Sequence, residues 1–416
     1  MWLPLTQDIL DRYRQAEFSV WREKCSPSSL KFARSLFCIL GGMATGTIGW
    51  SGNVHLLPAG MLFPAFWAYA PSRSVAALVA AAHFLGASRG LPQGASIFFG
   101  SQYVIGLGLW FAASLVFVAV HSALWTRRSG WPRMLRYLIA SVLMSLPPFG
   151  IMGWASPITA AGVLFPGWSW FGLAATAILL LAMTTRFWRI AVPVVAGCAA
   201  WSAAFWTEPK VIEGWTGINT TFRYEEAGQP ADYEQQRETI AMVRKAVGQG
   251  VKLAVLPESA LGLWTPTTER LWTDALSDLP VTVIGGAAVI QKSGYDTAIV
   301  EISRKGSRFL YRERMPVPVS MWQPWRRFTG DGGGANAYFF DNPVMQVAGY
   351  RAAPLICYEQ LLVWPVLQSM AMGSDVIVAI GNGWWTGDSN ITEIQRASVT
   401  AWAKLFDVPL LIAFNE

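Results

Sequence analysis

A nearly continuous apolar tract between residues 35 and 206 limits what this chain can fold into. Of its 416 residues, 53% are hydrophobic and only 14% are charged, whereas soluble domains carry about 25% charged residues. A helix that crosses a membrane needs about 20 apolar residues. The tract therefore predicts a transmembrane domain of about seven helices, at residues 35–50, 55–70, 75–87, 97–125, 135–155, 160–183 and 188–206.

The basic residues of this tract are unevenly distributed over the predicted loops. Every second loop is rich in arginine, with Arg73, then Arg127, Arg128, Arg133 and Arg136, then Arg186 and Arg189, while the loops between them hold only Arg89. Because arginine-rich loops stay in the cytoplasm, residues 1–34 are expected to be cytoplasmic and residues 207–416 periplasmic. This pattern predicts a multi-pass protein of the inner membrane.

The basic residues of the N-terminal segment and the net positive charge each allow two interpretations. Residues 1–34 form either an amphipathic helix on the membrane surface or an ordinary solvated helix. The net charge of +6 raises nucleic acid as a partner, but anchoring of the loops explains it, and we expect no direct binding of nucleic acid.

The character of the sequence changes at residue 207. Charged residues become frequent, and apolar strand-like runs alternate with helix-like segments. The predicted helices cover residues 232–248, 361–372 and 391–406, and the predicted strands cover residues 252–256, 280–290, 297–302, 307–311, 344–349, 353–357, 375–380 and 409–414. This alternation is typical of an α/β domain. The expected domains are therefore a cytoplasmic segment (1–34), a transmembrane domain (35–206) and an α/β domain (207–416).

Polar side chains follow three of the predicted strands. Glu258 follows the first, Cys357 and Glu359 end another, and Asn382 follows a third. A strand-end cysteine beside carboxylates is a candidate nucleophile, although most free cysteines are buried packing residues. The four cysteines and three histidines show neither metal-ligand nor disulfide-framework spacing. No metal site and no cofactor are therefore predicted.

Taken in order, these motifs resemble those of the nitrilase, or carbon–nitrogen hydrolase, superfamily. They read Leu256-Pro-Glu258-Ser, Ile356-Cys357-Tyr-Glu359 and Asn382-Gly-Trp-Trp385-Thr-Gly-Asp388-Ser. With a membrane part before them, they are similar to the apolipoprotein N-acyltransferases and, in size, to a family of plasmid conjugal transfer proteins. The resemblance implies a multi-span α-helical membrane domain followed by an α-β-β-α sandwich. Because the family continues beyond the strand that ends at Asn415, the sandwich is expected to be truncated at its C-terminus.

The resemblance also implies roles for the strand-end residues. Glu258 would be the general base, Cys357 the nucleophile that forms an acyl-enzyme, and Glu359 a supporting acid. Tyr358 matches the family's aromatic after the nucleophile. A carboxylate base suits a thiol, because a thiol of pKa about 8.5 is only slightly ionised at neutral pH.

One family residue is missing. The family stabilises the tetrahedral intermediate with a lysine, and the matching position here is Glu313. Arg312 and Arg314 flank it, and neighbouring residues on a strand point to opposite faces. Arg314 is the predicted substitute, with loss of the side chain expected to lower the rate roughly 10²-fold or more.

Four aromatic residues and one asparagine are predicted to bind substrate. The set comprises Tyr358, Trp385, Asn382, Trp264 and Trp322. Residues 315–334, which carry Trp322 and Trp325, form either a mobile lid that touches lipid or an exposed loop over packed aromatics.

Two functions follow from these observations. The first is a membrane-bound cysteine amidase or N-acyltransferase that acts on a membrane lipid or acylated substrate in conjugal plasmid transfer. The second is a catalytically impaired scaffold of the conjugation apparatus, with the proteins of that apparatus as partners. Glu258, Cys357 and Glu359 favour the enzyme, while Glu313 and the short C-terminus favour the scaffold. A transporter is disfavoured because the predicted spans contain few ionisable residues.

Overall fold

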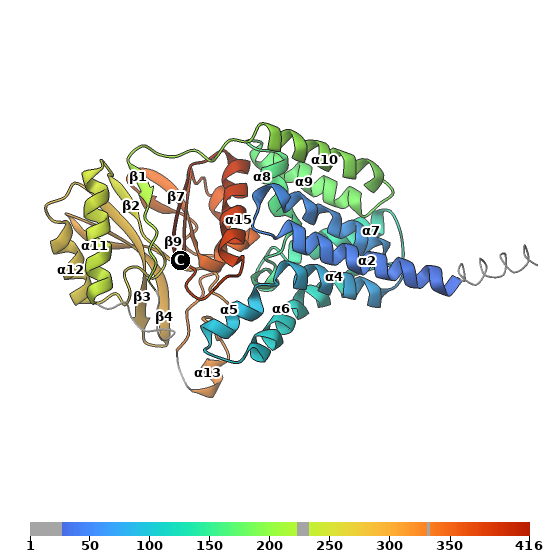
Figure 1. Ribbon diagram of the computed structural model, residues 1–416, viewed down its shortest axis with the longest axis horizontal. Coiled ribbons are helices and arrows are strands. Elements are labelled where there is room, and N and C mark those ends of the chain that lie inside the picture. The colour runs from blue at the N-terminus through green and yellow to red at the C-terminus, as the bar shows by residue number, and fades with distance from the viewer. Residues whose placement is uncertain (1–26, 223–232, 331–332) are drawn as a thin grey trace, which may run out of the picture.

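The computed structural model describes residues 27–222, 233–330 and 333–416. Most of residues 1–34, predicted to be a cytoplasmic segment, thus lies outside the described residues. Figure 1 shows helices packed side by side in one half of the molecule and two sheets in the other, with α15 between the halves.

The helical half contains α-helices and shorter 3₁₀ turns. They are α2 (Pro27–Gly49), η1 (Val54–Leu62), α3 (Phe63–Tyr69), α4 (Arg73–Ala87), α5 (Leu91–Phe98), α6 (Tyr103–Leu124), α7 (Trp131–Leu143), η2 (Phe149–Met152), η3 (Pro157–Ala160), α8 (Ala161–Leu164), α9 (Ser169–Met183) and α10 (Trp188–Ala204). Within the described residues, two helices are long and apolar enough to cross a membrane, Ser29–Gly49 and Tyr103–Leu124. The pair α4 and α5 makes a third if its 58° bend lies within one span.

The apolar tract is therefore more broken than the sequence predicted. The segment predicted as a span at 55–70 divides into η1 and α3, with Pro58 inside η1 and Pro64 at the start of α3. The segment at 160–183 divides into α8 and α9 around Gly167, whose φ of +79° is left-handed. Proline removes a backbone donor, and a left-handed residue ends a helix. Seven continuous helices are not observed, and a multi-span arrangement stays a prediction.

Small residues set the packing of the helical half. A Cβ atom on Gly46 would lie 2.0 Å from the His83 carbonyl oxygen, and one on Gly42 would lie 2.8 Å from that of Val79. Gly42 and Gly46 thus form a glycine pair, four residues apart, that lets α2 approach the backbone of α4. Behind this contact, Trp67, Phe63 and Phe84 are buried.

The C-terminal half contains two sheets. The first has the order β1 (Trp215–Gly217), β2 (Leu253–Val255), β3 (Thr282–Gln291), β4 (Gly294–Ser303) and β5 (Gly306–Arg312); the second has β6 (Met345–Val347), β7 (Tyr350–Ile356), β8 (Val376–Asn382) and β9 (Leu410–Asn415). Strands β7, β8 and β9 run parallel. An apolar layer that includes Val255, Ile284, Ile356 and Val378 fills the space between the sheets.

Helices cover the outer faces of both sheets. On the first sheet lie α11 (Tyr233–Gly248) and α12 (Pro266–Leu276), through Val243 and Trp272. On the second lie α14 (Val363–Ala371) and α15 (Ile391–Phe406). These layers make the α-β-β-α sandwich that the resemblance implied. All predicted strands of this half are present, whereas β1 and α12 were not predicted. The Thr265 cap and Pro266 at the start of α12 were the local signal that could have revealed it.

The two halves meet across α15. A Cβ atom on Gly162 of α8 would lie 1.6 Å from the Ala401 carbonyl oxygen of α15, so only glycine permits this approach. Trp402 on the same helix packs among the residues of the second sheet. Helix α15 therefore fixes the sandwich to the helical half (Figure 1).

Candidate active site

The candidate nucleophile lies where β7 gives way to the short helix η4 (Cys357–Leu361). Cys357 is buried, and its φ of +44° is unusual for a residue with a side chain. Such backbone strain persists only where the surrounding structure imposes it, and it is common at functional sites. Because β7 and β8 are parallel neighbours, with Ile356 opposite Ile380, the end of β8 at Asn382 lies beside the thiol.

Glu258 reaches the same thiol from the first sheet. It follows β2, is buried, and its carboxyl group lies beside the Cys357 thiol. Burial raises the pKa of Glu258 to about 7, and the neighbouring thiol opposes the rise. A Cβ atom on Gly286 of β3 would lie 1.8 Å from the Glu258 carbonyl oxygen, so only glycine allows β3 to lie this close to the Glu258 backbone. The geometry pairs a base candidate with a nucleophile candidate.

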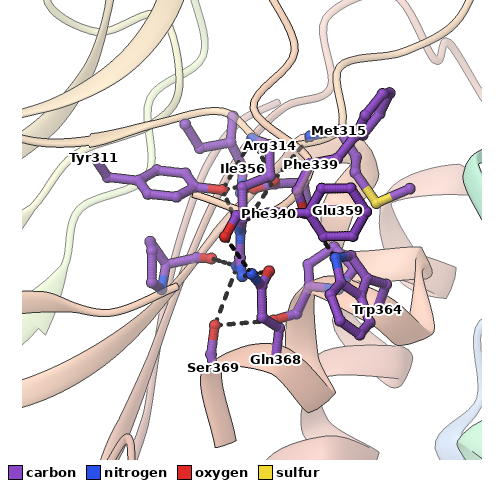
Figure 2. Close-up of polar contacts among 12 residues, drawn as sticks. Tyr311, Arg314, Met315, Phe339, Phe340, Ile356, Glu359, Trp364, Gln368 and Ser369 are labelled. Atoms are coloured by element: carbon purple, nitrogen blue, oxygen red, sulfur yellow. Dashed lines mark hydrogen bonds and ion pairs between the residues drawn. The ribbon is translucent and has the colours of Figure 1, made fainter. Parts of the chain in front are cut away.

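Both carboxylate oxygens of Glu359 accept hydrogen bonds, as Figure 2 shows. Its Oε1 accepts hydrogen bonds from the Tyr311 hydroxyl at 2.6 Å and from the backbone N–H groups of Arg314 at 2.9 Å and Met315 at 3.2 Å. Its Oε2 accepts from the Ile356 N–H at 2.9 Å. Burial raises the pKa of Glu359, while Arg314 and these donors lower it. Because every contact donates to the carboxylate, Glu359 is placed as an ionised group.

Arg314 faces Glu359 and α14. Its Nε donates to the Tyr311 hydroxyl at 3.0 Å and lies 3.8 Å from Glu359. Its Nη atoms donate to Gln368, Ser369 and the Pro354 carbonyl, as the dashed lines in Figure 2 mark. These contacts make Arg314 a residue that positions Glu359. Its predicted contact with the oxyanion stays a prediction. The other flanking arginine, Arg312, is half exposed and lies 3.4 Å from Asp296.

Glu313 lies inside the site. Its side chain is 1% exposed, and neither carboxyl oxygen has a hydrogen-bond partner of ordinary length in the described part of the chain. Burial raises the pKa of Glu313 well above its usual value, and the charges of Glu359 and Glu258 raise it further, while the Thr297 side chain acts in the opposite direction. The neutral acid is therefore the favoured form of Glu313.

The Cys357 thiol is surrounded by acids rather than cations. Burial raises the pKa of Cys357 well above its usual value, and Glu258 and Glu313 add to the rise. The backbone N–H of Asn382 acts the other way. The resting form is therefore a thiol with a neighbouring base, not a preformed thiolate.

The predicted substrate residues do not all lie at the thiol. Asn382 does, and its Nδ2 donates to the Ser259 hydroxyl at 2.8 Å. The Tyr358 hydroxyl instead donates to the Ile151 carbonyl in the helical half. Trp385 also contacts that half, since a Cβ atom on Gly94 of α5 would lie 2.6 Å from its ring.

The other two predicted tryptophans pack against hydrophobic clusters other than the one that contains Cys357. Trp264 packs against the cluster under α11 and α12. Trp322 packs edge-on against Phe339, with ring centroids 5.4 Å apart. In the same loop, Trp325 caps the short helix α13 (Arg326–Thr329) and Phe328 lies within it. Both side chains are exposed. Residues 331–332 of this predicted lid lie outside the described residues.

Two residues near the thiol were missed by the sequence analysis. Gln395 of α15 donates its Nε2 to the Cys357 Sγ at 3.8 Å. Tyr295 of β4 lies close enough to Glu313 and Glu258 that, after burial, their charges raise its pKa. Nothing in the local sequence marks either residue, because each comes from an element distant in the chain. Within the described ranges no three His, Cys, Asp or Glu side chains are placed to hold a metal ion.

The buried thiol and base at the strand ends of an α-β-β-α sandwich agree with the family comparison. Residues 102–404 match the carbon–nitrogen hydrolase family, and the chain belongs to that family. The match begins at residue 102, immediately before α6 of the helical half.

Among individual proteins, the chain is similar to the conjugal transfer protein TraB of Agrobacterium fabrum. The two are 52% identical over 421 residues, which cover 99% of this chain and 100% of that protein. A probable conjugal transfer protein TraB of Sinorhizobium fredii is 52% identical over 376 residues, covering 90% of this chain and 97% of that one. A solved amidase of the nitrilase superfamily from Nesterenkonia is a distant structural neighbour, with a TM-score of 0.37 and 14% identity over 49% of this chain and 78% of that chain.

Proposed function

We propose that this protein is a membrane-bound, nitrilase-type cysteine amidase or N-acyltransferase that acts in conjugal plasmid transfer. The observation that carries the proposal is that the buried Glu258 carboxyl group lies beside the buried Cys357 thiol, where the ends of strands from the two sheets meet. The names of the two similar proteins supply the conjugation context.

The pair supports a two-step acyl transfer. Glu258 takes the thiol proton as the Cys357 Sγ attacks the carbonyl carbon of an acyl donor, and the carbonyl π electrons move to its oxygen. The tetrahedral intermediate then collapses to a thioester, and the leaving group departs with the proton from Glu258. An amine or water next attacks the thioester and gives its proton to Glu258, which returns it to the departing Sγ. The acyl group ends as an amide or an acid.

The surface of the helical half supports a membrane location. Large apolar side chains are exposed along several helices, among them Phe32, Phe37, Leu115, Phe171, Ile190 and Trp201. A monomeric soluble protein rarely exposes so much apolar surface, because water penalises it. With the arginine-rich loops on one side, this surface favours a multi-pass protein of the inner membrane whose sandwich, residues 207–416, lies in the periplasm.

The test is the intact mass of the purified full chain after incubation with phospholipid. A covalent acyl adduct on Cys357, located by peptide mapping, is the expected result. Cys357→Ala should form none. Cys198→Ser, which changes a cysteine outside the site, is the matched control and should behave like the parent.

A second function is favoured by one observation. Apart from burial, two acids, Glu258 and Glu313, raise the pKa of the Cys357 thiol, and no cation in the described residues lowers it. This arrangement suits a non-catalytic scaffold of the conjugation apparatus. Plasmid transfer at the normal level by Cys357→Ala, together with no acyl adduct on the parent, would establish the scaffold and exclude the enzyme.

A further inference from the structure

Glu313 differs from the other two acids of the site in what surrounds it. Glu359 has four donated hydrogen bonds and the Arg314 guanidinium. Glu258 has the Cys357 thiol beside it. Glu313 has no cation beside it, and in the described part of the chain the one donor that acts on its buried carboxyl group is the Thr297 side chain, which makes no hydrogen bond of ordinary length to it.

Such a buried carboxyl group is stable only as the neutral acid, because an unpaired charge is expensive to bury. The ionisable groups that face it are Glu258, Glu359, Cys357 and Tyr295, and none of them is a cation. A neutral carboxylic acid still has one O–H to donate, and in an apolar site it can serve as an oxyanion donor.

We propose that Glu313, as the neutral acid, donates its carboxyl O–H to the oxyanion that forms when Cys357 attacks an acyl carbonyl. This inference rests on the proposed acyl transfer and assigns to Glu313 the task that the resemblance gave to a lysine. No proton is transferred in the step, since the O–H only hydrogen-bonds the negative oxygen. The backbone places Glu313 for this task, because its N–H donates to the Thr297 carbonyl at 2.8 Å and continues the pairing of β5 with β4.

The experiment measures the rate of Cys357 acylation by a short-chain p-nitrophenyl ester, using the full chain in detergent. Glu313→Gln keeps a donor of similar shape and should retain most of the rate. Glu313→Ala removes the donor and should lower the rate roughly 10²-fold or more, the scale for one oxyanion donor. Tyr295→Phe removes the other nearby hydroxyl and tests whether Tyr295, rather than Glu313, is the donor.

Two further readouts separate this role from a structural one. Alkylation of Cys357 by iodoacetamide forms no oxyanion, so Glu313→Ala should not slow it. The ratio of the parent rate to the Glu313→Gln rate should fall as pH rises, because only the parent loses its donor by ionisation.

The outcomes are distinct. Absence of any acylation in the parent removes the proposed function together with the inference. If the parent is acylated but Glu313→Ala is equally fast, or Glu313→Gln is as slow as Glu313→Ala, the inference alone fails. A large loss in Tyr295→Phe without one in Glu313→Ala would likewise overturn it.

A second inference is carried by a cavity in the helical half. The cavity has a volume of about 610 Å³ and lies among the start of α2, the end of α3, the start of α7 and the loops that follow α6 and α9. Five of its lining residues are cationic: Lys31, Arg34, Arg127, Arg133 and Arg186. Figure 1 shows the start of α2 at the end of the molecule opposite the sheets.

No acidic residue balances these charges in the helical half, since the sequence has no Asp or Glu between Glu23 and Glu208. The guanidinium of Arg34 donates to the Tyr69 carbonyl at 2.7 and 3.0 Å. The Nη2 of Arg133 donates to the Arg127 carbonyl at 3.2 Å, but its buried Nε has no partner in the described part of the chain. The cavity thus offers several unneutralised arginine donors, which suit a phosphate group.

We propose that this cavity binds the phosphate of an anionic lipid headgroup. The position of the cavity favours a lipid as the source of the phosphate. Exposed Leu30 and Phe32 flank the cavity on α2 and would lie at the edge of the bilayer. Basic pockets between helices at the cytoplasmic face are suited to such headgroups. The inference uses the proposed membrane location but not the acyl-transfer activity.

The experiment measures the Tm of the purified full chain. The shift caused by phosphatidylglycerol is compared with the shift caused by phosphatidylcholine of the same acyl chains. For the parent protein, phosphatidylglycerol should raise Tm more than phosphatidylcholine does. Arg34→Gln with Arg133→Gln should at least halve this difference. Arg128→Gln with Arg136→Gln removes the same charge from exposed residues outside the cavity and should keep it.

Arg133→Lys, which preserves the charge, controls for misfolding of the cavity variant and should retain most of the lipid effect. An equal loss in the cavity and control variants would mean general surface attraction and would overturn the proposal. Inorganic phosphate that stabilises the parent as much as the lipid does would overturn the lipid assignment.

Discussion

The Nε atom of Arg314 lies 3.8 Å from the carboxylate of Glu359, and both side chains are fully buried. This pair places one of the two arginines that flank Glu313 beside the supporting acid rather than beside the thiol. The site therefore contains one acid neutralised by a cation, one acid beside the thiol and one acid without a partner of either kind in the described residues. Each environment favours a different protonation state, which is how carboxyl groups in one site acquire different roles.

The first prediction concerns this buried pair. Arg314→Gln should destabilise the protein by about 3–5 kcal/mol, because it leaves the Glu359 charge buried without its partner. Urea unfolding of the full chain in detergent measures the effect. The control is Arg244→Gln, which breaks an exposed pair with Asp278 and should cost less than about 1 kcal/mol. A similar loss in both variants would contradict the prediction. A rate loss of roughly 10²-fold in the folded fraction would additionally support contact with the oxyanion.

The second prediction concerns pH and Glu258. The acylation rate of Cys357 should rise with pH through about 7, because Glu258 accepts the thiol proton only as a carboxylate and burial raises its pKa to about 7. Glu258→Gln should lower the rate and abolish this rise. A profile of the parent that stays flat across about pH 6 to 8 would argue against Glu258 as the base.

Folding stability should fall, rather than rise, as Glu258 ionises. Between the ordinary carboxyl pKa of 4.5 and the folded value of about 7, the folded protein binds this proton more tightly than the unfolded chain. The contribution of Glu258 to stability is therefore present at low pH and is lost as pH rises across this interval. The loss should be smaller in Glu258→Gln.

The third prediction concerns the reactivity of the thiol. Glu313→Lys should increase the rate at which iodoacetamide alkylates Cys357 at pH 7, because it replaces an acid near the thiol with a cation and lowers the pKa of Cys357. It should also raise acyl transfer if the lysine reaches the oxyanion. The Cys198 alkylation rate serves as an internal control and should not change. An unchanged Cys357 rate would place the Glu313 side chain too far from the thiol to matter.

The fourth prediction divides the predicted lid into two parts. Trp325→Ser should weaken the use of a lipid substrate with little loss of Tm, because Trp325 is exposed. Trp322→Ser should lower Tm, because it removes the contact with Phe339. The comparison uses a lipid donor and a soluble ester. If Trp325→Ser slows both donors equally, the loop has no specific contact with lipid.

The fifth prediction concerns topology. A reporter that is active only in the periplasm should be active when fused after Glu416, because the arginine-rich loops favour a cytoplasmic start to α2 and a periplasmic sandwich. A matched fusion in the loop between α6 and α7, at residues 125–130, should be inactive. Activity of a cytoplasm-only reporter at Glu416 would remove the seven-span prediction.

The sequence by itself determined the sandwich. Alternating apolar runs located the strands, and the predicted helix at 391–406 coincides with α15. It also marked Glu258, Cys357 and Asn382 as candidate site residues, because each lies at or just after the end of a predicted strand. The family resemblance added what local patterns do not encode, namely that two sheets would bring Glu258 and Cys357 together from different layers.

Only the tertiary structure decided the environment of each charge. From sequence, Arg312, Glu313 and Arg314 were three charged neighbours after a strand, and Arg314 was the expected partner of the oxyanion. In the fold, Arg314 meets Glu359 and α14, Arg312 lies toward Asp296 with half its side chain exposed, and Glu313 is buried in the site. Likewise, composition marked 35–206 as apolar but could not place its helix breaks. Hydrophobic period and strand ends are local properties, whereas desolvation and charge pairing depend on groups that only folding brings together.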